Sequence, residues 1–95
     1  MELTVGPHII RVLTGEDVDI DLAERGLTGE SDSNRLTIRV RSDLPASVRN
    51  ETLLHELLHH VINLTHLAAR WSDEEEEEVV RALSPLLSMA VRVAE

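Results

Sequence analysis

The residues that can do chemistry are concentrated at positions 55–59, which read His55-Glu56-Leu57-Leu58-His59, an H-E-x-x-H motif. Residues i and i+4 lie on one face of an α-helix, so His55 and His59 can direct two imidazole nitrogens at one metal ion. Glu56 lies beside the first histidine and can act on a water molecule at the metal without binding the metal itself. The motif therefore supplies two zinc ligands and a general base within one short segment.

The residues around the motif favour a helix that can present it. Apolar residues flank the motif on both sides, and the stretch from Thr52 to Ile62 contains neither Gly nor Pro. An alternative interpretation is a buried helix whose histidines only hydrogen-bond to their neighbours. Two histidines on an apolar face are costly without partners, so the metal site is the stronger hypothesis.

A catalytic zinc site needs a third protein ligand, and the acidic run from Glu74 to Glu78 is the main source of candidates. The run opens a second predicted helix, whose buried face is marked by Val79, Val80 and Leu83. Glu76 lies three, four and seven residues before them, so it extends that face by one turn. The pattern therefore predicts Glu76 as the third ligand and Glu75 as the second choice. The remaining glutamates are expected to face outward more: Glu74, Glu77 and Glu78.

Histidines elsewhere in the chain are weaker alternatives for the third ligand. His66 follows His59 by seven residues, which places it near the same helix face. His8 belongs to a predicted strand, where a histidine is usually solvated. His60 points about 100° away from His59, and we expect it at the surface or behind a ligand rather than on the metal.

Two helices must position these groups. The first runs from about residue 46 to about residue 65 and carries the motif on a broad apolar surface. The second runs from about residue 73 to about residue 93, is capped by Ser72 or Asp73, and begins with acidic residues, as the helix dipole favours. Pro85 lies inside this second helix and is expected to kink or split it.

Strand patterns precede the motif helix. Residues 8–13 read as one strand, and residues 35–41 are the clearest strand, because apolar and polar side chains alternate there. The polar turn at 31–34 makes this segment one arm of a hairpin with the 27–30 region. Residues 17–22 also alternate, which indicates either a further strand or an irregular segment.

The expected fold is α+β. Strands between about residues 8 and 41 form a small twisted, antiparallel-rich sheet, which packs on the motif helix and on a second, C-terminal helix. Residues 1–95 are few enough for a single domain. The hydrophobic fraction is 42%, but the chain has one Trp and neither Phe nor Tyr, so a bound metal would add stability to a core of aliphatic side chains.

Composition excludes several other classes of protein. The absence of cysteine rules out a disulfide framework, a cysteine zinc finger and a thiol nucleophile. A net charge of −9 argues against nucleic acid as a partner. Neither a signal peptide nor a membrane-spanning stretch is visible in the sequence, so we expect a cytoplasmic protein without a membrane partner.

Several segments together resemble a known family. The first two are the segment Gly26-Leu27-Thr28-Gly29-Glu30 with the turn through Asp32, and the strand from Leu36 to Val40. The other two are the motif helix from Glu51 to His59 and the glutamate helix from Glu75 to Leu83. From about residue 26 onward the chain is similar to the small gluzincin-type zinc metallopeptidases, which include the minigluzincins and the compact ImmA/IrrE-like proteins of phages and prophages.

The resemblance implies a zincin-like fold, in which a small twisted sheet covers the motif helix and the glutamate helix lies behind it. It also implies that the strand at 36–40 borders the substrate cleft, where an extended peptide pairs with it through backbone hydrogen bonds. Two features depart from the family pattern. Val80 stands four residues after Glu76, where gluzincins often carry Asp or Asn, and the chain has no Tyr to stabilise an oxyanion.

The sequence therefore predicts a zinc-dependent peptidase that acts on a peptide or protein substrate. Zn²⁺ is held by His55, His59 and Glu76, and Glu56 takes a proton from the attacking water. The alternative is a metal-binding zincin-like module that is catalytically weak or inactive and acts by binding a partner, for example as a phage regulator. In a latent form of this kind, the carboxylate of the C-terminal residues Val93-Ala94-Glu95 would occupy the open position on the metal.

Overall fold

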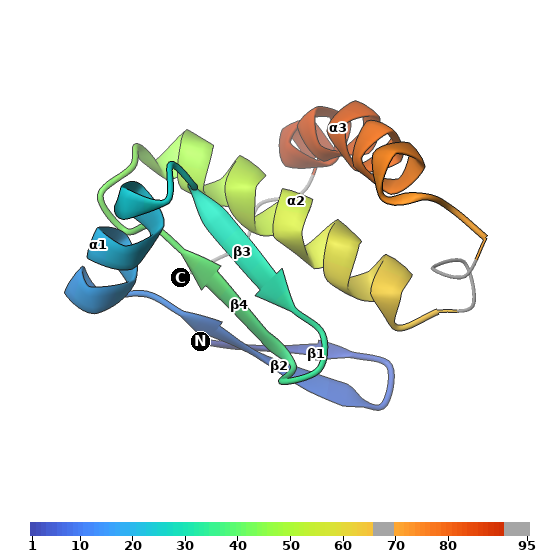
Figure 1. Ribbon diagram of the computed structural model, residues 1–95, viewed down its shortest axis with the longest axis horizontal. Coiled ribbons are helices and arrows are strands. Elements are labelled where there is room, and N and C mark those ends of the chain that lie inside the picture. The colour runs from blue at the N-terminus through green and yellow to red at the C-terminus, as the bar shows by residue number, and fades with distance from the viewer. Residues whose placement is uncertain (66–69, 91–95) are drawn as a thin grey trace.

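A computed structural model describes the backbone of residues 1–65 and 70–90 and the side chains of residues 1–65 and 70–87. This part of the chain forms four strands and three helices. Figure 1 shows how they are arranged. In order they are β1 (Glu2–Val5), β2 (His8–Leu13), α1 (Glu16–Glu24), β3 (Gly29–Asp32), β4 (Thr37–Val40), α2 (Ala46–Asn63) and α3 (Asp73–Ala90). The fold class is α+β, as the sequence predicts.

The sheet is mixed, with the strand order β1-β2-β4-β3. β1 and β3 pair antiparallel with their neighbours, whereas β2 and β4 are parallel to each other. This order corrects an expectation that came from the family resemblance. The strand at 36–40 does not line the cleft beside His55 and His59, because β4 is paired on both sides, and β3 is instead the edge strand of the described sheet next to α2.

α1 occupies the segment whose alternation suggested a strand or an irregular stretch. Acidic residues in its first turn suit the positive end of a helix dipole. Val18 and Leu22 are four residues apart and so share one helix face; Leu22 is fully buried, whereas Ile20 between them is exposed. The Asp19 carboxylate accepts hydrogen bonds from the backbone N–H and the hydroxyl of Ser42, at 2.7 and 2.6 Å, which fixes α1 beside the end of β4.

The apolar core lies between the sheet and α2. It consists of alternate residues of β2 and β4 together with one residue of α2: Ile10, Val12, Ile38, Val40 and Leu53. Gly29 lets β3 approach the same helix closely. A Cβ atom at this position would lie 2.7 Å from Cγ2 of Thr52 and 3.1 Å from Cγ of Glu56. The edge strand therefore runs directly beside the motif helix.

α3 packs against α2 and runs back along it (Figure 1). Ser72 caps its start, because the Ser72 hydroxyl accepts a hydrogen bond from the Glu75 N–H while the Glu75 carboxylate accepts one from the Ser72 N–H. The helix is not split at Pro85. None of the helices in the described part of the chain combines the length and the apolar character that a bilayer span requires.

Candidate metal centre

The two histidines of the motif converge with one glutamate of α3. His55 and His59 lie on one face of α2, with ring centroids 5.0 Å apart. The Glu77 carboxylate reaches both rings: Oε1 lies 3.2 Å from Nε2 of His55, and Oε2 lies 2.7 Å from Nε2 of His59. One donor atom from each of the three residues lies within 4.8 Å of the other two, so the group can surround a single ion.

The geometry and chemistry of this group fit zinc. In a tetrahedral site with bonds of about 2.1 Å, neighbouring donor atoms are about 3.4 Å apart. The separations of 3.2 and 2.7 Å between Glu77 and the two Nε2 atoms are close to this value, so small side-chain shifts suffice to admit an ion. Two imidazole nitrogens and one carboxylate also form a donor set that zinc prefers in catalytic sites.

Glu76 contacts the opposite nitrogen of the second histidine. Its Oε2 lies 2.6 Å from Nδ1 of His59, and its side chain is only 14% exposed. A carboxylate on the far nitrogen of a ligating histidine holds the proton there and keeps the other nitrogen free for the metal. Asn63 supports the arrangement, because its Nδ2 donates to the His59 carbonyl at 2.8 Å. Glu76 therefore orients His59 in this structure.

In the acidic run, the residue that joins the histidines is the one directly after the predicted ligand. Glu77, which was expected to face outward, joins the two histidines, whereas Glu76, the predicted ligand, lies on the outer side of His59. The prediction took its helix phase partly from Leu83, which is 43% exposed. The buried line of α3 is Val80 and Ser84, and Glu77 stands three and seven residues before them.

The other glutamates of the run are exposed. Glu75 belongs to the Ser72 cap and not to the ligand group. Glu74 and Glu78 are also exposed and lie outside it. If Ser84 instead of Leu83 is assigned to the buried face of α3, the sequence pattern ranks Glu77 equal to Glu76 as a candidate ligand.

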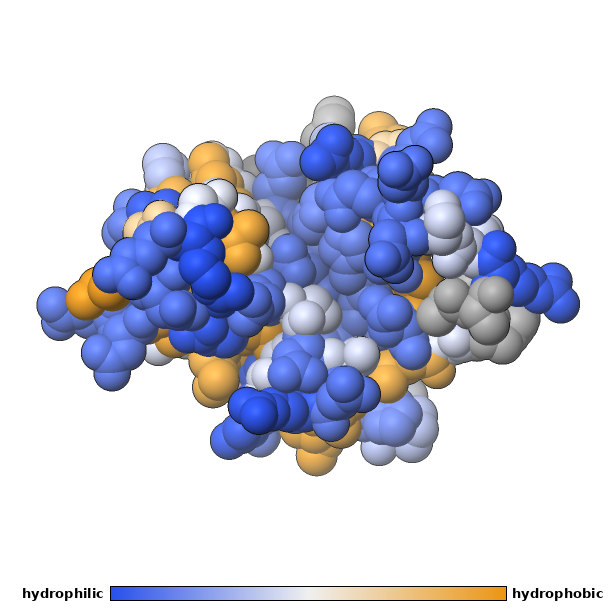
Figure 2. Space-filling model, viewed as in Figure 1, coloured by the Kyte–Doolittle hydropathy of each residue, from blue (hydrophilic) through white to orange (hydrophobic). Residues whose placement is uncertain are grey.

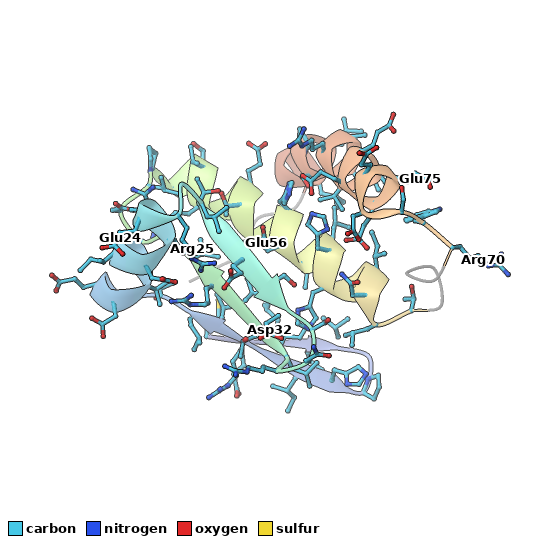
Figure 3. All side chains as sticks on the ribbon, in the orientation of Figure 1. Glu24, Arg25, Asp32, Glu56, Arg70 and Glu75 are labelled. Carbon is cyan, nitrogen blue, oxygen red and sulfur yellow. The ribbon has the colours of Figure 1, made fainter. Side chains whose placement is uncertain are left out.

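Glu56 lies on α2 close to the edge strand β3 (Figure 3), where its Cγ would be 3.1 Å from a Cβ atom at Gly29. The pKa of its carboxyl is raised to about 7, mainly by burial; His59 opposes the rise, and the carboxylates of Glu77 and Glu30 add to it. A carboxyl group whose pKa lies near 7 can both accept and return a proton at neutral pH. Burial also lowers the pKa of His55, which favours the neutral imidazole that a metal requires.

His60 does not lie at the surface: it is fully buried behind β3. Its Nδ1 is 3.1 Å from the hydroxyl oxygen of Ser31, and its Nε2 makes no hydrogen bond within the described residues. Burial lowers its pKa, so the ring is uncharged at neutral pH. The sequence did not point to Ser31, whose hydroxyl links the edge strand to the motif helix.

The remaining histidines do not contribute to the group. His8 lies on β2 and is not among the three residues that converge. His66, the alternative third ligand, lies outside the described residues, as does the C-terminal segment 93–95 that was considered as an occupant of the metal site.

A cleft of about 810 Å³ opens over these residues. One wall is β3 with the residues just before it, the floor is α2, and the other wall is the first half of α3. Hydrophilic side chains cover most of the face in Figure 2, and the apolar ones show mainly towards its margins. The cleft therefore gives polar surroundings and solvent access to the three candidate ligands.

Within the described residues, no strand pairs with β3 on the side away from β4. The N–H of Arg41 donates to the carbonyl of Thr28 at 3.0 Å. In an antiparallel pair, the hydrogen-bonding direction alternates from residue to residue. The backbone groups of Gly29 and Ser31 therefore point away from β4, and both residues line the cleft. An extended peptide can pair with this edge.

No protein-family model, curated protein or solved structure matches this chain.

Proposed function

We propose that this chain is a zinc-dependent peptidase with a zincin-like fold, related to the small gluzincin-type enzymes that its sequence resembles. The observation that carries the proposal is the convergence of His55, His59 and Glu77 on one point at the floor of the cleft. The half-buried Glu56 beside them supports it, because a metal-dependent hydrolase needs a general base within reach of the ligands.

Each residue of the centre has a distinct role in this proposal. A bound zinc ion would supply Lewis acidity, which polarises the peptide carbonyl and makes water more acidic. His55, His59 and Glu77 hold the ion, and Glu76 keeps the proton of His59 on Nδ1. Glu56 accepts a proton from the attacking water and returns it to the amine that leaves.

We propose a peptide in extended conformation as the substrate. It adds to the free edge of β3 and pairs with the backbone of Gly29 and Ser31, which places one of its carbonyl groups over the histidines. Backbone pairing is indifferent to side-chain identity, so selectivity has to come from the cleft walls. This replaces β4, the strand that the family resemblance had suggested as the substrate-binding strand.

The alternative proposal is a metal-binding module that acts by binding a partner. The complete lack of Tyr in the sequence favours it, because many related enzymes use Tyr or His to stabilise the oxyanion. The two proposals share the metal site and differ only in turnover.

Two measurements on the purified protein decide between them. Metal content is determined by mass spectrometry, and cleavage of a peptide mixture is followed with and without a chelator. One zinc per chain with chelator-sensitive cleavage supports the peptidase, and zinc without cleavage supports the binding module. A protein that takes up no zinc would overturn both proposals. The double variant His55→Ala/His59→Ala is the control that should lose both zinc and cleavage.

A further inference from the structure

We propose that Arg81 is a catalytic residue that stabilises the oxyanion formed when water attacks the peptide. The inference rests on the proposed peptidase function. The chain has no Tyr that could stabilise the oxyanion. Arg81, on the α3 wall of the cleft, takes this role instead.

Arg81 is joined to the candidate ligand group through a single carboxylate oxygen. It lies one turn after Glu77 on α3, and its Nε donates to Oε1 of Glu77 at 3.0 Å. The same Oε1 lies 3.2 Å from Nε2 of His55. The guanidinium therefore stands at the edge of the metal centre, with further N–H groups left to donate.

The side chain of Arg81 is free to turn towards a substrate. It is 76% exposed, so neighbouring side chains do not confine it to one position. It lines the cleft across from β3, the strand on which the peptide is proposed to lie. A peptide that pairs with β3 through its backbone would therefore have the guanidinium of Arg81 on its other side.

Charge also singles out Arg81. The charged side chains along the cleft are otherwise acidic: Glu30, Glu51, Glu56, Glu76 and Glu77. Among the described residues that line the cleft, Arg81 is the only one that carries a positive charge. Arg81 is therefore the charged side chain of the described lining that attracts an anion developing in this cleft.

Other polar groups near the centre are either buried away from the cleft or already hydrogen-bonded. His60 is buried behind β3, and the Ser31 hydroxyl is within hydrogen-bond distance of its ring. Nδ2 of Asn63 donates to the His59 carbonyl. None of these groups combines positive charge with freedom to follow the reacting oxygen, and Arg81 has both.

The reaction needs only water as a co-reactant. The water oxygen bonds to the carbonyl carbon, its proton passes to Glu56, and the π electrons of the carbonyl move onto the oxygen. Arg81 donates an N–H to that oxygen, whose negative charge is greatest in the tetrahedral intermediate. When the carbonyl re-forms, the C–N bond breaks and the amine takes the proton from Glu56. The products are a carboxylic acid and an amine, and the acid then releases its remaining proton to the amine or to solvent.

The simpler interpretation is a surface ion pair between Glu77 and Arg81, four residues apart on one helix. Such exposed pairs contribute little to stability and imply no role in the reaction. The two interpretations predict different effects of removing the cation. Loss of a surface pair affects helix stability slightly, whereas loss of an oxyanion donor affects the reaction rate.

The test compares Arg81→Ala and Arg81→Lys with Arg35→Ala, a control at an exposed arginine outside the cleft. Zinc affinity, kcat and KM are measured for each. Loss of one oxyanion donor typically lowers kcat by about 100-fold or more. We expect this loss for Arg81→Ala, with KM and zinc affinity little changed, partial recovery in Arg81→Lys, and no effect in Arg35→Ala.

A binding measurement gives a second readout that does not depend on turnover. Calorimetry on zinc-loaded protein compares a peptide phosphonate, whose anionic oxygens mimic the tetrahedral intermediate, with the cleaved product peptide. Arg81→Ala should weaken phosphonate binding about as much as it lowers kcat and leave product binding unchanged.

Four outcomes would overturn the inference. An unchanged kcat in Arg81→Ala would leave only the surface ion pair. A loss traced to zinc affinity would mean that Arg81 merely positions Glu77. A rise in KM confined to peptides with a free C-terminal carboxylate would mean that Arg81 binds the substrate terminus. A wild-type protein without zinc or cleavage would remove the proposed function, and this inference with it.

Discussion

Glu76 and His59 are joined by a hydrogen bond of 2.6 Å between Oε2 and Nδ1. The bond leaves Nε2 of His59 turned towards Glu77, at 2.7 Å. Two adjacent glutamates of one helix thus occupy the two sides of a single imidazole ring. This relationship assigns the neighbouring glutamates different roles, because a metal ion fits on only one side of the ring together with His55.

The two glutamates should respond differently to substitution. Glu77→Gln removes a charged ligand and is expected to cause the largest loss of zinc affinity in the acidic run. Glu76→Gln keeps all three proposed ligands and removes only the negative charge of the group that orients His59, and the expected loss is about 10- to 100-fold. Zinc titration in the presence of a competing chelator measures both, with the exposed Glu74→Gln as a matched control. A larger loss in Glu76→Gln than in Glu77→Gln would restore Glu76 as the ligand.

Glu56→Gln should separate metal binding from turnover. Glutamine has nearly the same size as glutamate but cannot accept the proton of the attacking water, so peptide cleavage should be lost while one zinc per chain is retained. Metal analysis and a cleavage assay on the same preparation measure the two properties. Cleavage at the wild-type rate would show that another residue is the base.

Gly29→Ala should destabilise the fold. Its Cβ would lie 2.7 Å from Cγ2 of Thr52, so β3 would have to move away from α2. Overpacking of this kind costs about 1–3 kcal/mol, which urea denaturation can measure. The double variant Gly29→Ala/Thr52→Ser, which lacks the clashing methyl group, should recover part of the loss. If the double variant is no more stable than Gly29→Ala, the contact with Thr52 is not the cause.

Ser31→Ala should cost stability through His60. The change removes the described hydrogen-bond partner of a fully buried ring. A buried polar group left unpaired costs about 1–3 kcal/mol, a loss that should appear as a lower urea midpoint without a change in slope. Ser33→Ala, in the turn after β3, is the matched control. Equal midpoints for Ser31→Ala and the wild type would mean that the hydrogen bond contributes nothing net.

The ion pairs between α1 and the sheet predict acid sensitivity. The pKa of Asp21 is lowered from 3.8 by hydrogen bonds with Arg39 and Arg25, and the pKa of Glu30 is lowered from 4.5, mainly by Arg25. A carboxyl group whose pKa is lower in the folded protein than in the unfolded chain stabilises the fold when the pH is above its unfolded pKa. This contribution is lost as the pH falls through the pKa of the folded state. Stability should therefore fall below about pH 4.5, and less steeply in Asp21→Asn. Urea midpoints from pH 6 down to pH 3 test this, and parallel curves for the two proteins would contradict it.

The main elements of the fold could be predicted because their patterns were unambiguous. α2 lies at Ala46–Asn63, where a long stretch without Gly or Pro repeats its apolar residues with helical spacing. β4 lies within 35–41, where alternation extends over a whole strand. α1 was missed because residues 17–22 satisfy two periods at once: apolar residues two apart suggest a strand, and Val18 and Leu22 also fit one helix face.

The candidate site was predictable where it depends on spacing within one helix. His55, Glu56 and His59 follow from the motif alone. The contacts between elements could not be predicted, because they depend on how helices and strands pack together. The choice between Glu76 and Glu77 required the rotation of α3 against α2, and the contact of Ser31 with His60 required the placement of β3.

The zinc site is tested most directly by a crystal structure of the zinc-loaded protein with an anomalous difference map at the zinc absorption edge. We predict a single strong peak within about 2.3 Å of Nε2 of His55, Nε2 of His59 and a carboxylate oxygen of Glu77, with Glu76 still on Nδ1 of His59. A peak at another place on the chain, or no peak after loading with zinc, would contradict the proposed centre.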